Sequence, residues 1–211
     1  MKPISREPSG AADFSSQILK IKAKKPDTMV ITMYTSDHIV FSRQYMENKL
    51  DFPFGLHSVG AGAEDPAFYK AVPPAAYEYM FVQEDWQIDM TDIMGWAHGL
   101  SARTQKDLGY PLCNYVAQGY MPIWIAYDAL ERAGSLDRDK IRDALAKTNI
   151  TSGPALIMGY QKIAFDEQGQ NTFAHGVISQ NQKSKHIGLF PVANRAPGSK
   201  VIWPIPPWSQ R

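Results

Sequence analysis

The chain has 211 residues, of which 44% are hydrophobic and 20% charged, and 22 basic residues against 21 acidic ones give a formal charge of +1. This balance lacks the basic surface that nucleic-acid binding requires, so we expect no nucleic-acid partner. No apolar run is long enough to span a bilayer. The single cysteine, Cys113, excludes an internal disulfide and a cysteine-rich zinc site. The N-terminus has no charged segment followed by an apolar one, so no signal peptide is visible.

The first 84 residues predict alternating helices and strands. Helices are expected to begin at Asp13, which is a good N-cap residue, and at Asp65-Pro66, which combines a cap with a proline in the first turn. A further helix is expected over 37–49. Short apolar runs typical of buried strands occupy 28–34, 54–59 and 79–82. This alternation predicts a parallel α/β sheet.

After Glu84 the pattern changes to helical stretches at 90–107, 113–133 and 137–147. Pro122 lies inside the second stretch and is expected to kink it or to mark an irregular turn. From residue 155 the pattern is again that of strands. Turns at 166–169 and 181–185 then predict two hairpins.

Two loops follow predicted parallel strands, and ligands in open α/β sheets bind at the carboxyl ends of strands. Tyr34, Thr35 and Ser36 could hydrogen-bond a small polar ligand, although the same residues could simply form a turn and a helix cap. Gly60–Asp65 is not a dinucleotide fingerprint, because Asp65 occupies the third glycine position. It is either an ordinary strand-to-helix loop or a backbone that approaches a ligand closely.

The sequence contains little that points to metal binding or catalysis. No two of the five histidines have the spacing of a helical metal pair, no Gly-x-Ser-x-Gly motif occurs, and nothing in the sequence marks Cys113 as a nucleophile. We therefore expect no catalytic residue, no metal and no cofactor. Glu84 and Asp85 lie where the pattern changes; they are either a solvated acidic pair or, with Trp86, part of a hinge.

Several segments together resemble one family. The residues that carry the resemblance are Asp13–Gln17 through Asp27, Tyr127–Ser135, Ile141–Leu145, Gly153-Pro154, Phe165–Asn171 and Pro206–Trp208. In order and spacing they are similar to type I periplasmic ligand-binding proteins, in the group around the leucine/isoleucine/valine-binding protein that serves ABC importers. The resemblance covers nearly the whole chain.

The resemblance implies an α/β fold of the type I periplasmic-binding-protein class, with two lobes joined by a hinge and the ligand between them. Complete members are considerably longer, so this chain would be a C-terminal part that lacks some of lobe one, and the signal peptide would lie in the missing part. Residues 1–84 would form most of lobe two, 85–152 a helical return into lobe one, and 153–211 the crossing back with β-hairpins and a C-terminal tail.

The implied function is binding without turnover, so the protein is not expected to be an enzyme. It would be the solute-binding receptor of an ABC importer of the branched-chain amino acid type, periplasmic when intact, and would dock on an ABC permease in the inner membrane. Its ligand would be an amino acid, an aromatic or aliphatic carboxylate, or an amide. The alternative is a cytoplasmic ligand-sensing regulatory protein on the same fold; an unrelated α/β enzyme is a third possibility.

The resemblance also assigns site residues. Tyr34 corresponds to a ligand-contacting tyrosine of lobe two and Tyr115 to an aromatic residue that lines the cleft from lobe one. The glutamate that pairs with the ammonium group in amino-acid binders falls on Ser58 or Val59, neither of which is acidic. Because a buried ammonium without its carboxylate is costly, a ligand without an amino group is favoured. A partial lobe exposes apolar faces, so we expect a chain that is marginally stable or self-associates.

Overall fold

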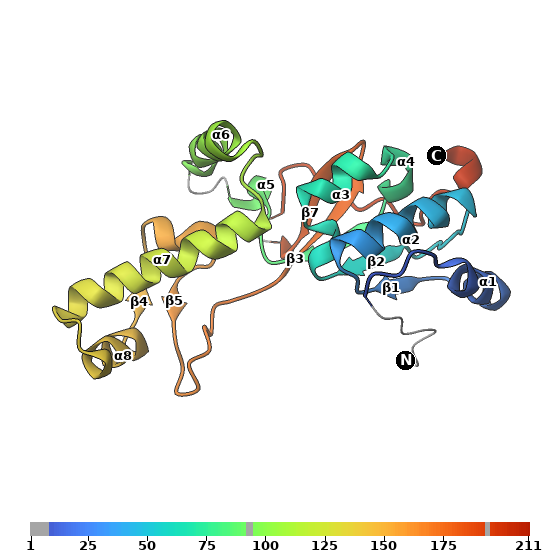
Figure 1. Cartoon of the computed structure of the whole chain (residues 1–211). Helices are drawn as coiled ribbons and strands as arrows, with labels where there is room; N and C mark the ends of the chain where they lie inside the picture. Colours follow the sequence, from blue (N-terminus) through green and yellow to red (C-terminus); the bar gives the residue numbers. More distant parts are fainter. Residues whose placement is uncertain (1–8, 92–94, 193–194) are drawn as a thin grey trace. The chain divides into compact units, whose positions relative to one another are not determined.

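The computed structural model describes residues 9–91, 95–192 and 195–211. They form two compact units (Figure 1): the first combines the chain up to Glu84 with Ile178–Arg211, and the second is Asp85–Val177. The first unit contains α1 (Ser15–Lys24), β1 (Met29–Ile31), α2 (Thr35–Glu47), β2 (Leu56–Val59), η1 (Ala61–Ala63), α3 (Pro66–Ala71), α4 (Pro74–Tyr77), β3 (Phe81–Glu84), most of β6 (Val177–Gln182), β7 (Lys185–Phe190) and η5 (Trp208–Gln210). The second contains α5 (Ile88–Thr91), α6 (Ala97–Leu108), α7 (Asn114–Ala133), α8 (Arg138–Ala146), β4 (Asn149–Ile150), η3 (Pro154–Met158) and β5 (Ile163–Ala164).

The first unit is built on a sheet of strand order β1-β2-β3-β6-β7. β1, β2 and β3 are parallel, with Val30 opposite His57 and His57 opposite Phe81, which confirms the predicted parallel α/β arrangement. The Tyr79 amide donates to the Asn181 carbonyl of β6, and the Asn181 amide donates to the carbonyl of Met80, just before β3. β6 and β7 form an antiparallel hairpin. The carboxyl ends of β1, β2 and β3 therefore lie along one edge of the sheet.

The helix starts follow local chemistry. Asp65 caps α3 by accepting the amide of Ala67, as predicted. The prediction of Asp13 as an N-cap is wrong: Phe14 occupies that position, and the Asp13 carboxylate instead accepts hydrogen bonds from Ser15 Oγ and Gln44 Nε2.

One face of the sheet carries the core of the first unit. Buried apolar side chains of the helices pack there on the strands; the largest members of this cluster are Phe14, Phe41, Tyr45, Phe52, Phe68, Tyr77 and Met80. The expectation of a buried strand within 28–34 holds only in part: Ile31 is buried, but Val30 in β1 is 51% exposed. β1 is an edge strand, and its side chains alternate between the core and the opposite face.

The second unit is mainly helical. α7 is one continuous helix, so the irregular turn predicted at Pro122 is not found. Pro122 lies on an exposed side, where water can solvate the carbonyl that loses its donor. The predicted hairpin at the 166–169 turn is present but short: Phe165 pairs antiparallel with Asn171, and the Thr172 amide donates to the carbonyl of Ala164. On its other side β5 pairs with β4, a contact that was not predicted.

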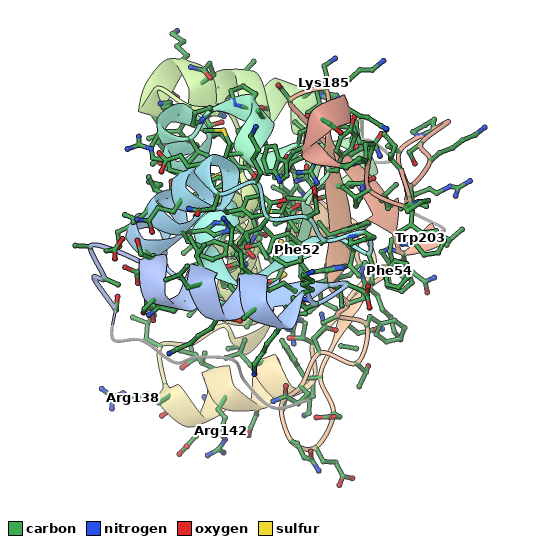
Figure 2. The ribbon with its side chains drawn as sticks, turned by 90° about the vertical axis from the view of Figure 1, so that its right-hand side faces the viewer. Phe52, Phe54, Arg138, Arg142, Lys185 and Trp203 are labelled. Atoms are coloured by element: carbon green, nitrogen blue, oxygen red, sulfur yellow. The ribbon has the colours of Figure 1, made fainter. Side chains whose placement is uncertain are left out.

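The C-terminal segment returns to the first unit. The Ile205 amide donates to the carbonyl of Pro53, and the Trp208 indole donates to that of Leu50. Phe54 and Trp203 stack with their ring centroids 5.3 Å apart (Figure 2). The tail is therefore held along the segment that precedes β2.

Candidate functional site

The loops after β1 and β2 meet at the carboxyl edge of the sheet. Tyr34 occupies the N-cap position of α2 and is 68% exposed, and Ser36 in the first turn is also exposed. Thr35 Oγ1 donates to Asp65 Oδ2 at 2.9 Å, which ties the first loop to the residue that caps α3. The exposed Tyr34 and Ser36 thus lie beside a hydrogen bond that fixes both loops.

Close packing holds the second loop in place. Gly60 adopts a φ of 87°, a conformation that favours glycine. A Cβ added to Gly62 would lie 2.6 Å from the carbonyl oxygen of Met33, so only glycine lets η1 approach the end of β1 this closely. Ser58 is buried, whereas Val59 and Gly60 are partly exposed. The segments that follow β1 and β2 are therefore in contact through Thr35 with Asp65 and Met33 with Gly62.

Tyr115 belongs to the second unit. It lies in the first turn of α7 and is 40% exposed. It is not part of the group of residues that the first unit brings together.

The predicted hinge residues lie where the chain leaves the first unit. Glu84 is 4% exposed and accepts a hydrogen bond from Ser179 Oγ, so the description of Glu84 and Asp85 as a solvated acidic pair is wrong for Glu84. Asp85 is exposed and accepts from Gln118 Nε2 at 2.6 Å. Trp86 is buried and donates to the carbonyl of Ile157.

Sequence reasoning missed the partners of Glu84. Ser179 is fully buried, and His186 Nδ1 lies 3.4 Å from the same carboxylate oxygen. Both residues lie about 100 positions along the chain from Glu84. No local sequence signal connects them, because the contact exists only once β3 and β6 are neighbours in the sheet.

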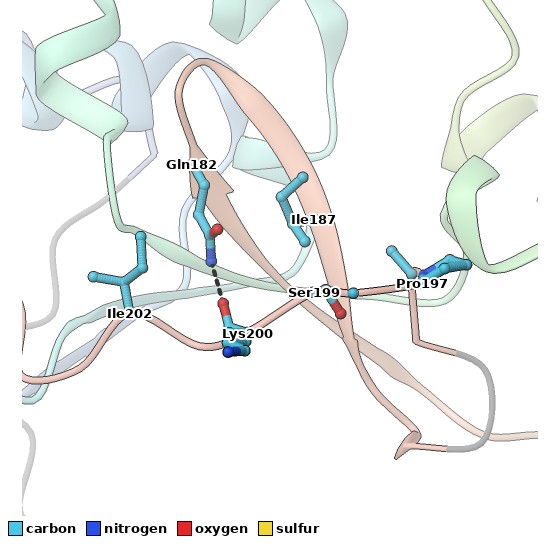
Figure 3. Close-up of a pocket in the computed structure, with 8 residues that line it drawn as sticks. Gln182, Ile187, Pro197, Ser199, Lys200 and Ile202 are labelled. Atoms are coloured by element: carbon cyan, nitrogen blue, oxygen red, sulfur yellow. Dashed lines mark hydrogen bonds between the residues drawn. The ribbon is translucent and has the colours of Figure 1, made fainter.

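A separate hollow of about 390 Å³ lies between the β6–β7 hairpin and the segment 196–202 (Figure 3). The Gln182 amide reaches across it to the carbonyl of Lys200 at 2.8 Å. None of the predicted ligand residues lines this hollow, so it does not coincide with the edge where the two loops meet.

In the part of the chain that the structure describes, no three histidine, cysteine or acidic side chains come together as metal ligands. No helix there combines the length and apolarity that crossing a membrane demands.

The sequence matches the family model described as periplasmic binding protein over residues 5–183. The chain belongs to the periplasmic binding protein family. The family and the fold are those of ligand-binding proteins. The α/β architecture and the resemblance to the leucine/isoleucine/valine-binding group are thereby confirmed.

Individual periplasmic binding proteins are similar to this chain along most of its length. Leu/Ile/Val-binding protein homolog 7 of Brucella abortus is 26% identical over 190 residues, which cover 88% of this chain and 46% of that protein. The structure is similar to that of the leucine-binding protein LivK of Thermotoga maritima, with a TM-score of 0.70 and 23% identity over 85% of this chain and 48% of that one.

A third relative is a solute-binding protein of an ABC transporter from Rhodopseudomonas palustris, solved in complex with 3,4-dihydroxybenzoic acid. Its TM-score is 0.64 at 18% identity, over 82% of this chain and 46% of that one. This chain therefore spans about half the length of the relatives that it matches.

Proposed function

We propose that this chain is part of the solute-binding receptor of an ABC importer of the branched-chain amino acid type. The observation that supports this most directly is that the segments after β1 and β2 meet at the carboxyl edge of the parallel sheet in a periplasmic binding protein, through the contacts of Thr35 with Asp65 and of Met33 with Gly62. The intact receptor would be periplasmic, would close on its ligand and would dock on a permease in the inner membrane. Ligand contacts that form only in the closed state would favour that state.

We further propose that the ligand is a small carboxylate or amide without an amino group. Neither 34–36 nor 58–60 contains an acidic residue. The nearby Asp65 uses one oxygen for Thr35 and the other for the amide of Ala67, and Asp37 accepts the amide of Gly10. The residues matched to the ligand site therefore offer an ammonium group no carboxylate of their own.

The domain assignment is also part of this proposal. We assign 1–84 to most of lobe two, 85–152 to lobe one, and 153–211 to the crossing back, with Glu84, Asp85 and Trp86 at the hinge. α7 supports the second assignment, because it is apolar on two sides. Its buried side carries Ala117, Ile125 and Ala129, and its opposite side exposes an uncharged stripe at Tyr115, Gly119, Ile123, Ala126 and Leu130.

A helix that is apolar on both sides is normally packed on both. The relatives contain about as much chain again as this one covers. We assign the stripe on α7 to contact with the part of lobe one that this chain does not span.

Ligand binding can be tested by urea unfolding, followed by the fluorescence of the five tryptophans. The panel would be leucine, isoleucine, 3,4-dihydroxybenzoate and benzamide. A ligand that binds the folded chain at a hundredfold excess over its Kd raises the free energy of unfolding by about 2.7 kcal/mol. We expect this rise with the carboxylate or the amide and not with the two amino acids.

The matched variants are Tyr34→Ala and Leu19→Ala, since both side chains are about two-thirds exposed. Tyr34→Ala should abolish the ligand-induced rise, and Leu19→Ala should retain it. A rise with leucine would refute the proposed ligand class. No rise with any compound would refute ligand binding by this chain.

A further inference from the structure

A buried polar cluster joins the strands at which the chain leaves and rejoins the first unit. Glu84 is the last residue before the chain leaves, and Ser179 is the second after it returns. Ser179 Oγ donates to Glu84 Oε1 at 2.5 Å, and His186 Nδ1 lies 3.4 Å from the same oxygen. The cluster thus connects β3, β6 and β7 through one carboxylate, which is almost completely shielded from water.

Tyr69 of α3 lies between this cluster and the loop after β2. Its hydroxyl donates to the carbonyl of Ala63, in η1, at 2.7 Å. Its ring meets the His186 ring edge to face, with centroids 4.6 Å apart. Burial and then the negative charge of Glu84 raise the pKa of Tyr69 well above its ordinary value, so the hydroxyl stays protonated and can donate.

We propose that Tyr69 is a positioning residue that couples the 60–63 loop to the Glu84–Ser179 pair. The inference rests on the proposed function, because it gives the loop the role of a ligand contact. For closure, the ligand-bound conformation of the loop must stabilise the closed conformation of the hinge strands, and the reverse. Tyr69 contacts both: its hydroxyl donates to the loop and also interacts with the Asn181 side chain of β6, and its ring packs on His186 of the cluster.

The coupling can be tested without ligand by amide hydrogen exchange on the full chain. Tyr69→Phe removes only the hydroxyl and should speed exchange of the 60–64 amides about fivefold, the factor expected for one hydrogen bond. Ser179→Ala is the second variant, and Ser179 makes no hydrogen bond to the loop among the contacts described for 9–91 and 178–192. It should nevertheless speed exchange of the same amides, and it should have no further effect when Tyr69 is already phenylalanine.

Tyr77→Phe is the matched control, since Tyr77 packs against the Tyr69 ring at 5.0 Å. It should leave exchange of 60–64 unchanged. If Ser179→Ala does not fold, Glu84→Gln replaces it, because glutamine has nearly the same size but removes the carboxylate charge that Ser179 Oγ and His186 Nδ1 face. The same order of effects is then expected.

Unchanged 60–64 exchange in Tyr69→Phe would overturn the proposal. So would acceleration by Tyr69→Phe alone, which would mean that Tyr69 only anchors the loop. Equal acceleration of all amides, those of α1 included, would indicate general destabilisation and would also overturn it. Since no ligand is present, failure here leaves the proposed function standing, and failure of the ligand panel leaves the coupling standing.

Discussion

His38 shows how the interior of the first unit sets the properties of one residue. Its side chain is fully buried and stacks on the ring of Phe68 at 4.5 Å. Burial lowers the pKa of His38 from 6.5 to about 4, and the nearby polar backbone of Gly62 opposes this only in part. His38 is therefore neutral in the folded protein at pH 7.

This burial makes stability depend on pH. Between about pH 4 and pH 6.5 the unfolded chain binds a proton at His38 that the folded chain does not, so the stabilisation is complete above pH 6.5 and is lost as the pH falls toward 4. At about 1.4 kcal/mol per pKa unit, the loss is about 3 kcal/mol. Urea unfolding at several pH values should show this slope, and His38→Phe should flatten it. Identical slopes in the two proteins would mean that another group is responsible.

At the scale of elements, α7 combines two requirements in one helix. Its buried side packs with the η3 segment, and Ile125 forms a small core with Leu156 of η3 and Ile163 of β5. Its exposed stripe has no charged residue over four turns. Solvent exposure of such a stripe favours association, because the free energy of the system falls when apolar surface is removed from water.

We expect the chain to self-associate through this stripe when nothing else covers it. Ile123 is 69% exposed. Ile123→Ser should weaken association about tenfold, which corresponds to about 1.4 kcal/mol. Sedimentation velocity measures the change. Leu136→Ser is the control, since Leu136 is 87% exposed but lies beyond the end of α7; an equal effect of the two variants would show that the stripe is not the contact.

At the scale of the whole molecule, two separate stretches of the chain form the first unit, and the C-terminal residues pack against the earlier stretch. Trp208 packs on Tyr45 with ring centroids 5.2 Å apart, and the Arg211 guanidinium lies 4.2 Å from the centre of the Trp208 ring. Arg211 also donates to the Tyr45 hydroxyl. The tail therefore contributes to the core that α1 and α2 form with the sheet.

Trp208→Ala should lower the free energy of unfolding by about 2 kcal/mol, less than for a fully buried tryptophan because Trp208 is only partly buried. Far-ultraviolet circular dichroism in urea measures this without depending on tryptophan fluorescence. Trp203→Ala is the matched control: Trp203 is 57% exposed, so its loss should cost clearly less. Equal losses would show that the tail is not anchored by Trp208.

The sequence by itself determined the features that depend on neighbouring residues. The alternation of helices and strands, the Asp65 cap and the positions of the strand-end loops follow from periodicity and capping within a few residues. The same local evidence was enough to indicate the family. Even at this level the prediction of Asp13 as an N-cap was wrong, because Gln44 of another helix donates a hydrogen bond to its carboxylate.

Only the tertiary structure decided which side chains meet across long separations. The hydrogen bond between Glu84 and Ser179, the pairing of β5 with β4, the exposure of Val30 and the neutral His38 depend on which elements lie side by side. Burial and electrostatic environment are properties of that packing, since they depend on how much water and which charges surround a group. No local pattern around Glu84 could therefore have shown that its carboxylate is buried.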